Sequence, residues 1–240
     1  AHKGGLHTSA LGKVGGASYE HIDPTLVGNG TRVLVSDLGG RAGMAMKASE
    51  FGLDLDSRAA AELSERLKVL EAEGFVFEAA DASLELLMRR SSGWDHDFFA
   101  VEAYRVSSYH REVPAVLRDG PADGDGVDLS TEATVKLWVG EERLAAVGEG
   151  NGPVNALDAA LRSALADRYP ALGRIHLTDF RVRVLDAPGQ ADTGAVVRVL
   201  IDFSDGDRAW TTTGVSPNII EASWTGLTDG IVFGLLHADD

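Results

Sequence analysis

In three segments of the second half of this chain, apolar and polar residues alternate one by one. Side chains along a strand point in turn to the two faces of a sheet, so a period of two predicts antiparallel strands with one buried and one polar face. A further strand is predicted over 98–106. The apolar positions of the three alternating segments are Ala133, Val135, Leu137 and Val139, then Phe180, Val182 and Val184, and then Val197, Val199, Ile201 and Phe203.

Two helical segments separate these strands, at 153 to about 169 and at 217 to about 236. Each opens with a proline, which suits the first turn of a helix. The turns before them, GNGP at 150–153 and GVSP at 214–217, share a G-x-x-P pattern 64 residues apart. This internal repeat predicts an α+β domain over residues 98–240, made of two strand-rich units that are each closed by a helix.

The first part of the chain has a helical period instead. Leu63, Leu67 and Leu70 recur on one face of a helix predicted over 58–73, and Gly74 is placed to end it. A second helix is predicted over 79–90. Residues 1–97 are therefore predicted to form a small, mainly helical subdomain.

Composition excludes several classes of function. The net charge of −15 disfavours binding to nucleic acid or to an anionic membrane surface. The absence of cysteine removes disulfides, thiolate zinc sites and a cysteine nucleophile, and it is compatible with the cytoplasm. No stretch approaches the apolar length of a membrane helix, and residues 119–128, with four Asp and three Gly, are predicted to form a surface loop.

Two residues near the start could take part in proton transfer. His7 is flanked by a Gly-rich segment and could act as a general acid or base, or it could be an ordinary surface histidine. Tyr19 could donate a hydrogen bond to a developing oxyanion, or it could be a packed aromatic. His2 and His7 are five residues apart, which suits neither a helix face nor a strand, so we predict no metal site.

The glycines around residue 150 suggest a different chemistry. Glycines before a helix allow backbone N–H groups to converge at its N-terminus, where an anion can bind. In an acidic chain, a small carboxylate ligand is more plausible there than a polyphosphate. Ordinary helix capping explains the same pattern, and the residues alone leave both interpretations open.

Five motifs, in order, resemble the C-terminal half of the α-isopropylmalate synthase superfamily, most closely its (R)-citramalate synthase branch. The motifs are HKGGLHTSA at 2–10, YEHIDPTLVGN at 19–29, FEAADASLELL at 77–87, EGNGPVNALDAAL at 149–161 and NIIEASW at 218–224. The resemblance implies an N-terminal catalytic TIM barrel, absent from this chain, that holds a divalent metal, followed by linker subdomains and a regulatory domain that forms a homodimer. No cofactor is expected in the chain itself.

The resemblance also implies roles for individual residues. His7 and Tyr19 fall on positions that reach the active site of the neighbouring subunit. The effector-binding turn of the first repeat falls on Gly150, Gly152 and Asn155, and that of the second repeat falls on Gly214 and Ser216.

The family reaction joins acetyl-CoA to a 2-oxo acid. In the branch that this chain resembles, the 2-oxo acid is pyruvate, and isoleucine or leucine is the expected effector. The alternatives are the regulatory part of a 2-isopropylmalate or homocitrate synthase, or an amino-acid-binding dimerisation module without a catalytic role. Without the barrel, residues 1–240 alone are expected to be inactive.

Overall fold

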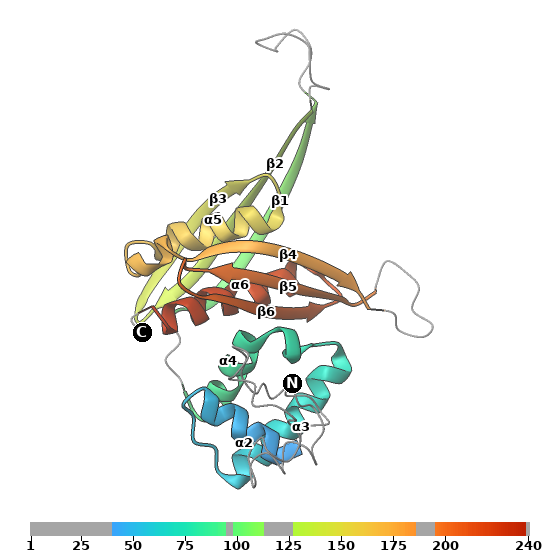
Figure 1. The fold of residues 1–240 in the computed structure, drawn as a ribbon. Helices are drawn as coiled ribbons and strands as arrows, with labels where there is room; N and C mark the ends of the chain where they lie inside the picture. Colours follow the sequence, from blue (N-terminus) through green and yellow to red (C-terminus); the bar gives the residue numbers. More distant parts are fainter. Residues whose placement is uncertain (1–39, 95–97, 113–126, 186–194, 239–240) are drawn as a thin grey trace. The chain divides into compact units, whose positions relative to one another are not determined.

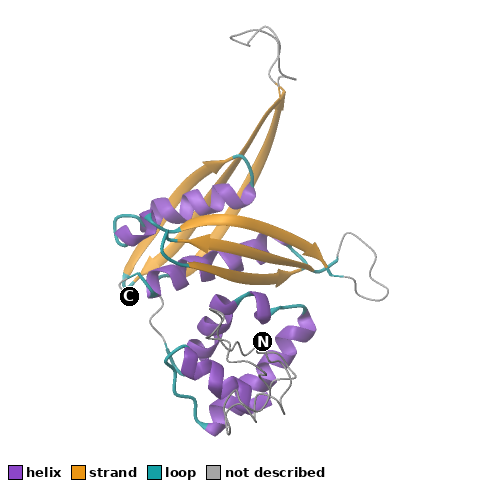
Figure 2. Cartoon of the chain, in the orientation of Figure 1, coloured by secondary structure: helices purple, strands orange, loops and turns teal. Residues whose placement is uncertain are grey.

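The computed structural model describes residues 40–94, 98–112, 127–185 and 195–238. The fold is α+β, as predicted, with two three-stranded sheets and helices packed against them (Figures 1 and 2). The chain forms two compact units. The first contains the helices before residue 95 with most of the second sheet and its helix, and the second contains the first sheet with its helix.

The described part of the first unit begins with three helices: α2 (Gly40–Glu50), α3 (Ser57–Glu73) and α4 (Asp81–Ser91), with a short 3-10 turn, η4 (Phe77–Ala79), before the last. Asp56 caps α3 by accepting a hydrogen bond from the backbone N–H of Ala59 at 2.7 Å. Gly74 ends the helix in the left-handed conformation, with φ of 111°, which glycine adopts without strain. Their common core includes Met44, Leu63, Leu67, Phe77, Leu84 and Met88.

The second sheet has the order β4 (His176–Val184), β5 (Val197–Ser204), β6 (Ala209–Ser216), and α6 (Ile219–Leu236) packs against it. Val199, Ile201 and Phe203 of β5 are fully buried, which confirms their predicted face. A Cβ on Gly230 of α6 would overlap the ring of Phe203, so glycine there brings the helix close to the sheet. More than half of α6 is buried, so its membrane-like length and apolarity are those of a core helix.

The second unit repeats this plan. Its antiparallel sheet contains β1 (Ala100–Glu112), β2 (Val127–Val139) and β3 (Glu142–Gly150), and it is covered by α5 (Pro153–Leu165), with a 3-10 turn, η6 (Pro170–Gly173), after the helix. Tyr169 donates a hydrogen bond to the carbonyl oxygen of Phe98 at 2.6 Å, and burial raises the pKa of its hydroxyl. The interior positions, all fully buried, are Ala133, Val135 and Leu137 of β2 and Leu157, Leu161 and Leu165 of α5.

Some predicted details are wrong. Helix α6 begins at Ile219 rather than at Pro217, because Asn218 caps it and the proline lies one residue before that cap. The strand predicted from Phe98 begins at Ala100, the helix predicted from Ala79 begins at Asp81, and α5 ends at Leu165 rather than near Tyr169. The predicted loop extends too far, because β2 starts at Val127; its residues 119–126 lie outside the described residues.

Strand β4 is also less buried than its alternation predicted. The side chains of Val182 and Val184 are 42% and 57% exposed. As an edge strand, β4 has only one neighbour in its sheet. The predicted division into domains 1–97 and 98–240 stays a prediction, because the compact units follow spatial contacts that group α2–α4 with the second sheet.

Candidate functional site

The first candidate turn, Gly150 to Pro153, joins β3 to α5, and its glycines have distinct structural roles. A Cβ on Gly150 would lie 2.7 Å from the backbone nitrogen of Ala156 and would overlap the side chain of Asn155. Gly152 has open space around its Cα and an extended backbone, with φ of −173°. Close approach of strand and helix therefore requires glycine at 150, whereas neither sterics nor backbone conformation requires it at 152.

The N-terminus of α5 lacks a side-chain cap. Gly152 occupies the N-cap position, and no side chain accepts a hydrogen bond there. Asn155 instead accepts a hydrogen bond from the backbone N–H of Asn151 at 3.3 Å, which closes the turn. The first N–H groups of a helix have no partner inside the helix, so this end can offer donors to an anion.

The second candidate turn shares the G-x-x-P pattern, but Ser216 stands where the first turn has its second glycine, Gly152. A Cβ on Gly214 would overlap the carbonyl oxygen of Ala222, so this glycine, like Gly150, permits close packing of strand and helix. Ser216 accepts a hydrogen bond from the backbone N–H of Asn218 at 3.0 Å and donates one to the carboxylate of Glu221 at 2.6 Å. Asn218 in turn accepts from the N–H of Ile220 at 2.9 Å. The helix terminus is thus capped from within and carries its own carboxylate.

A groove of about 840 Å³ lies beside this second turn, between Ser216, the end of α3 and the ends of β4 and β5. Arg198 reaches across it and donates a hydrogen bond to the carbonyl oxygen of Gly74 at 2.9 Å. Burial, and secondly the charge of Arg183, lowers the pKa of the Arg198 guanidinium. The arginine ties the C-terminus of α3 to the sheet, where a cation is favoured by the helix dipole.

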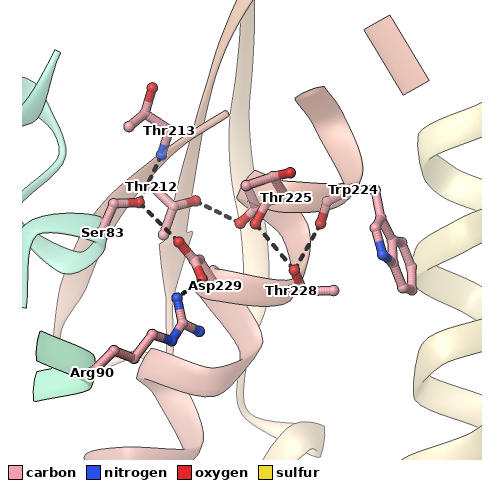
Figure 3. Close-up of polar contacts among 9 residues, drawn as sticks. Ser83, Arg90, Thr212, Thr213, Trp224, Thr225, Thr228 and Asp229 are labelled. Carbon is pink, nitrogen blue, oxygen red and sulfur yellow. Dashed lines mark hydrogen bonds and ion pairs between the residues drawn. The ribbon is translucent and has the colours of Figure 1, made fainter. Parts of the chain in front are cut away.

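Polar contacts also connect α4 to β6 and α6 within the first unit (Figure 3). The Oγ of Ser83 on α4 accepts a hydrogen bond from the backbone N–H of Thr213 on β6 at 3.0 Å. The same hydroxyl donates to the carboxylate of Asp229 on α6 at 3.4 Å, and Arg90 pairs with that carboxylate at 2.9 Å. We call the residues Ser83, Arg90, Thr213 and Asp229 the α4 junction.

Comparison with known protein families identifies both parts of the sequence. Residues 78–234 match the LeuA allosteric (dimerisation) domain, and residues 1–74 match the homocitrate synthase post-HMGL domain-like family. The first match covers well over half of the chain. This protein belongs to the LeuA allosteric (dimerisation) domain family.

Individual relatives agree with this assignment. The chain is 47% identical to an (R)-citramalate synthase of Streptomyces coelicolor, over 99% of this chain and 42% of the relative. It is 46% identical to one of Aquifex aeolicus, over 100% and 43%, and 36% identical to one of Sulfolobus acidocaldarius, over 98% and 40%. The chain thus spans about two fifths of the length of the relatives that it matches.

Both candidate turns and the whole α4 junction lie inside the LeuA domain match. Gly150, Gly152 and Asn155 come together in the second unit, and Gly214 and Ser216 come together in the first. No sequence motif predicted the α4 junction. Its partners are 130 to 146 residues apart, so no local spacing or periodicity signals them.

The two predicted catalytic residues, His7 and Tyr19, lie outside the described residues, and their roles stay predictions. Among the residues that the structure does describe, no group of three His, Asp or Glu side chains could hold a metal ion.

Proposed function

We propose that this chain is the C-terminal linker and regulatory part of an (R)-citramalate synthase. The observation that carries the proposal is 44–47% identity, over essentially the whole chain, to four proteins of that name. In this role the enzyme joins acetyl-CoA, pyruvate and water to give citramalate and CoA. The relatives are more than twice as long as this chain, and we assign the condensation to the part of the enzyme outside it.

The first test is substrate choice in the whole enzyme. We expect CoA release from acetyl-CoA with pyruvate to exceed, in kcat/KM, the release with 2-oxoisovalerate or 2-oxoglutarate. A preference for 2-oxoisovalerate or 2-oxoglutarate would replace the proposal with a 2-isopropylmalate or a homocitrate synthase, respectively. The second of these has some support, because residues 1–74 match a homocitrate synthase post-HMGL domain-like family. No condensation with any 2-oxo acid would favour the non-catalytic module.

We further propose that isoleucine, and leucine more weakly, is the feedback effector and that the first turn holds its carboxylate. The uncapped N-terminus of α5 supports this site, and the self-capped N-terminus of α6 argues against the second turn. We place the whole enzyme in the cytoplasm, in amino-acid biosynthesis. Its LeuA domain would form a homodimer, and we expect no nucleic-acid or membrane partner.

Gly152→Asp tests this site with a matched control. Aspartate at 152 would place a negative charge at the helix terminus and repel the ligand carboxylate, while open space and an extended backbone leave the fold intact. Gly173→Asp adds the same charge at another glycine of the second unit with open space around it. Isothermal titration should show isoleucine binding in wild type and Gly173→Asp but not in Gly152→Asp. Equal binding by both variants would remove the site from the first turn.

A further inference from the structure

The groove beside the second turn lies within the first unit, and backbone contacts hold its walls. Just past the end of β4, the backbone N–H of Leu185 donates to the carbonyl oxygen of Val196 at 2.9 Å, which continues the contact between β4 and β5. Leu185 also packs on the C-terminus of α3, because a Cβ on Gly74 would overlap its side chain. At about 840 Å³, the groove has the size of a small-molecule pocket, and its walls are formed without a ligand.

The lining of this groove is more positive than the chain as a whole. Its charged side chains are the two guanidinium groups of Arg183 and Arg198 and the carboxylate of Glu73, whereas the net charge of the chain is −15. Burial, and then the charge of Arg183, lowers the pKa of the Arg198 guanidinium. The two like charges are therefore near enough to repel each other, and an anion between them would relieve that repulsion.

Neither arginine forms an ion pair with a carboxylate of the described residues. Arg198 is half-buried, and its hydrogen-bond partner is a neutral group, the carbonyl oxygen of Gly74. Arg181, two residues before Arg183 on β4, is instead paired with the carboxylate of Asp202 at 2.7 Å. A charge that is partly removed from water is costly without a counter-charge. In the described part of the chain, the groove thus has two cations that lack the counter-charge their neighbour has.

The remaining lining indicates what kind of anion would fit. Most of it is apolar, and it includes Val184, Leu185, Val196 and Val215. A guanidinium binds a carboxylate through two parallel hydrogen bonds, and apolar walls favour an aliphatic chain. Two positive charges outweigh the one carboxylate of the lining, so a ligand with a net negative charge is favoured over a zwitterion, whose net charge is zero.

We propose that this groove binds a short branched aliphatic monocarboxylate that has no ammonium group. Its carboxylate lies at Arg183 and Arg198, and its alkyl chain lies along the apolar wall. The site is separate from the first turn and goes beyond the proposed function, because neither the reaction nor the feedback effector enters the argument.

The test compares three probes that share one carbon skeleton: 3-methylpentanoate, which is an anion, isoleucine, which is a zwitterion, and 3-methylpentanamide, which is neutral. Each is titrated calorimetrically into the whole protein carrying Gly152→Asp, so that the first turn does not contribute. In this background, Arg183→Gln removes a charge and no hydrogen bond among the described residues. Arg198→Lys keeps the charge but removes the planar fork. Arg181→Gln is the matched control, because it removes the same charge from the same strand at an arginine that is already paired.

We expect 3-methylpentanoate to bind and the other two probes to bind more weakly or not at all. Arg183→Gln should raise the dissociation constant of 3-methylpentanoate by about three- to fivefold, the usual size of one exposed ion pair. Arg198→Lys should raise it as well, and Arg181→Gln should leave it unchanged.

Three results would overturn the proposal. The first is no binding of 3-methylpentanoate, and the second is equal affinity for the amide, which would show that the arginines do not select a charge. The third is equal weakening by Arg181→Gln and Arg183→Gln, which would reflect the overall charge of the protein rather than this groove. None of them affects the proposed function, which is tested by substrate choice and by isoleucine binding to the protein with Gly152 intact.

Discussion

At the residue scale, two glycines of the same sequence motif differ in whether the fold requires them. Gly150 permits strand and helix to approach, whereas Gly152 meets nothing within contact distance. The motif alone could not separate these roles, because the distinction depends on atoms of Asn155 and Ala156 that face the strand only after folding.

The pair Gly150→Ala and Gly152→Ala tests this difference by thermal or denaturant unfolding. Alanine at 150 forces an overpacked contact, and we expect it to lower the free energy of unfolding by about 1–3 kcal/mol. Alanine at 152 should change it by less than about 0.5 kcal/mol. Equal losses in both variants would show that the strand–helix contact at 150 is not the constraint.

The predicted catalytic roles of His7 and Tyr19 can be tested by replacing each side chain singly. In the whole enzyme, His7→Ala and Tyr19→Phe should lower kcat by about 10²–10⁴-fold, the usual contribution of acid–base help. Metal content, measured by elemental analysis, should remain that of wild type. Turnover equal to wild type in both variants would make these residues structural.

At the element scale, α5 and α6 show how two copies of one pattern diverge. Both follow a glycine turn at the end of a strand, but only α6 is capped by side chains. Asn218→Ala should therefore destabilise the first unit by about 1 kcal/mol, the typical value of an N-cap. Asn151→Ala in the first turn, whose contact is through its backbone, should have little effect in the same unfolding assay.

The elements were predictable to different degrees. The positions and buried faces of strand β5 and helix α5 could be predicted from the periodicity of their apolar residues. Each element buries one face, so its apolar residues recur at the period of a strand or of a helix. Exposure of Val184 did not follow, since alternation reports which residues are apolar and not which of them a helix reaches. The bridge through Ser83 was beyond any local pattern, because it joins residues distant in the chain whose meeting depends on the packing of three elements.

At the scale of the whole molecule, several apolar side chains face solvent. Val147 is 55% exposed on the sheet of the second unit, and Trp138 is 39% exposed on β2. Val147 pairs across the strands with Thr134, and Trp138 pairs with Arg143. These residues lie on the sheet face that α5 does not cover. An uncovered sheet face that carries such residues is typical of an association surface, and the family is a dimerisation domain.

Val147→Asp is predicted to weaken the homodimer by placing a charge in that surface. Sedimentation velocity of the chain should show a shift towards monomer at concentrations where wild type is dimeric. Val69→Asp is the control, since Val69 on α3 is 58% exposed and lies on a helix rather than on this face. A dimer unchanged by Val147→Asp would place the interface elsewhere.

The internal cap of α6 has a consequence for stoichiometry. Ser216 and Asn218 already accept hydrogen bonds from two N–H groups at this terminus, those of Asn218 and Ile220, and Glu221 brings a negative charge of its own. In the second repeat, the carboxylate of Glu221 thus takes the place that a bound anion would have at the uncapped helix terminus of the first repeat. A titration should then saturate at one effector molecule per chain, although the sequence contains two turns, and two molecules should fill a dimer.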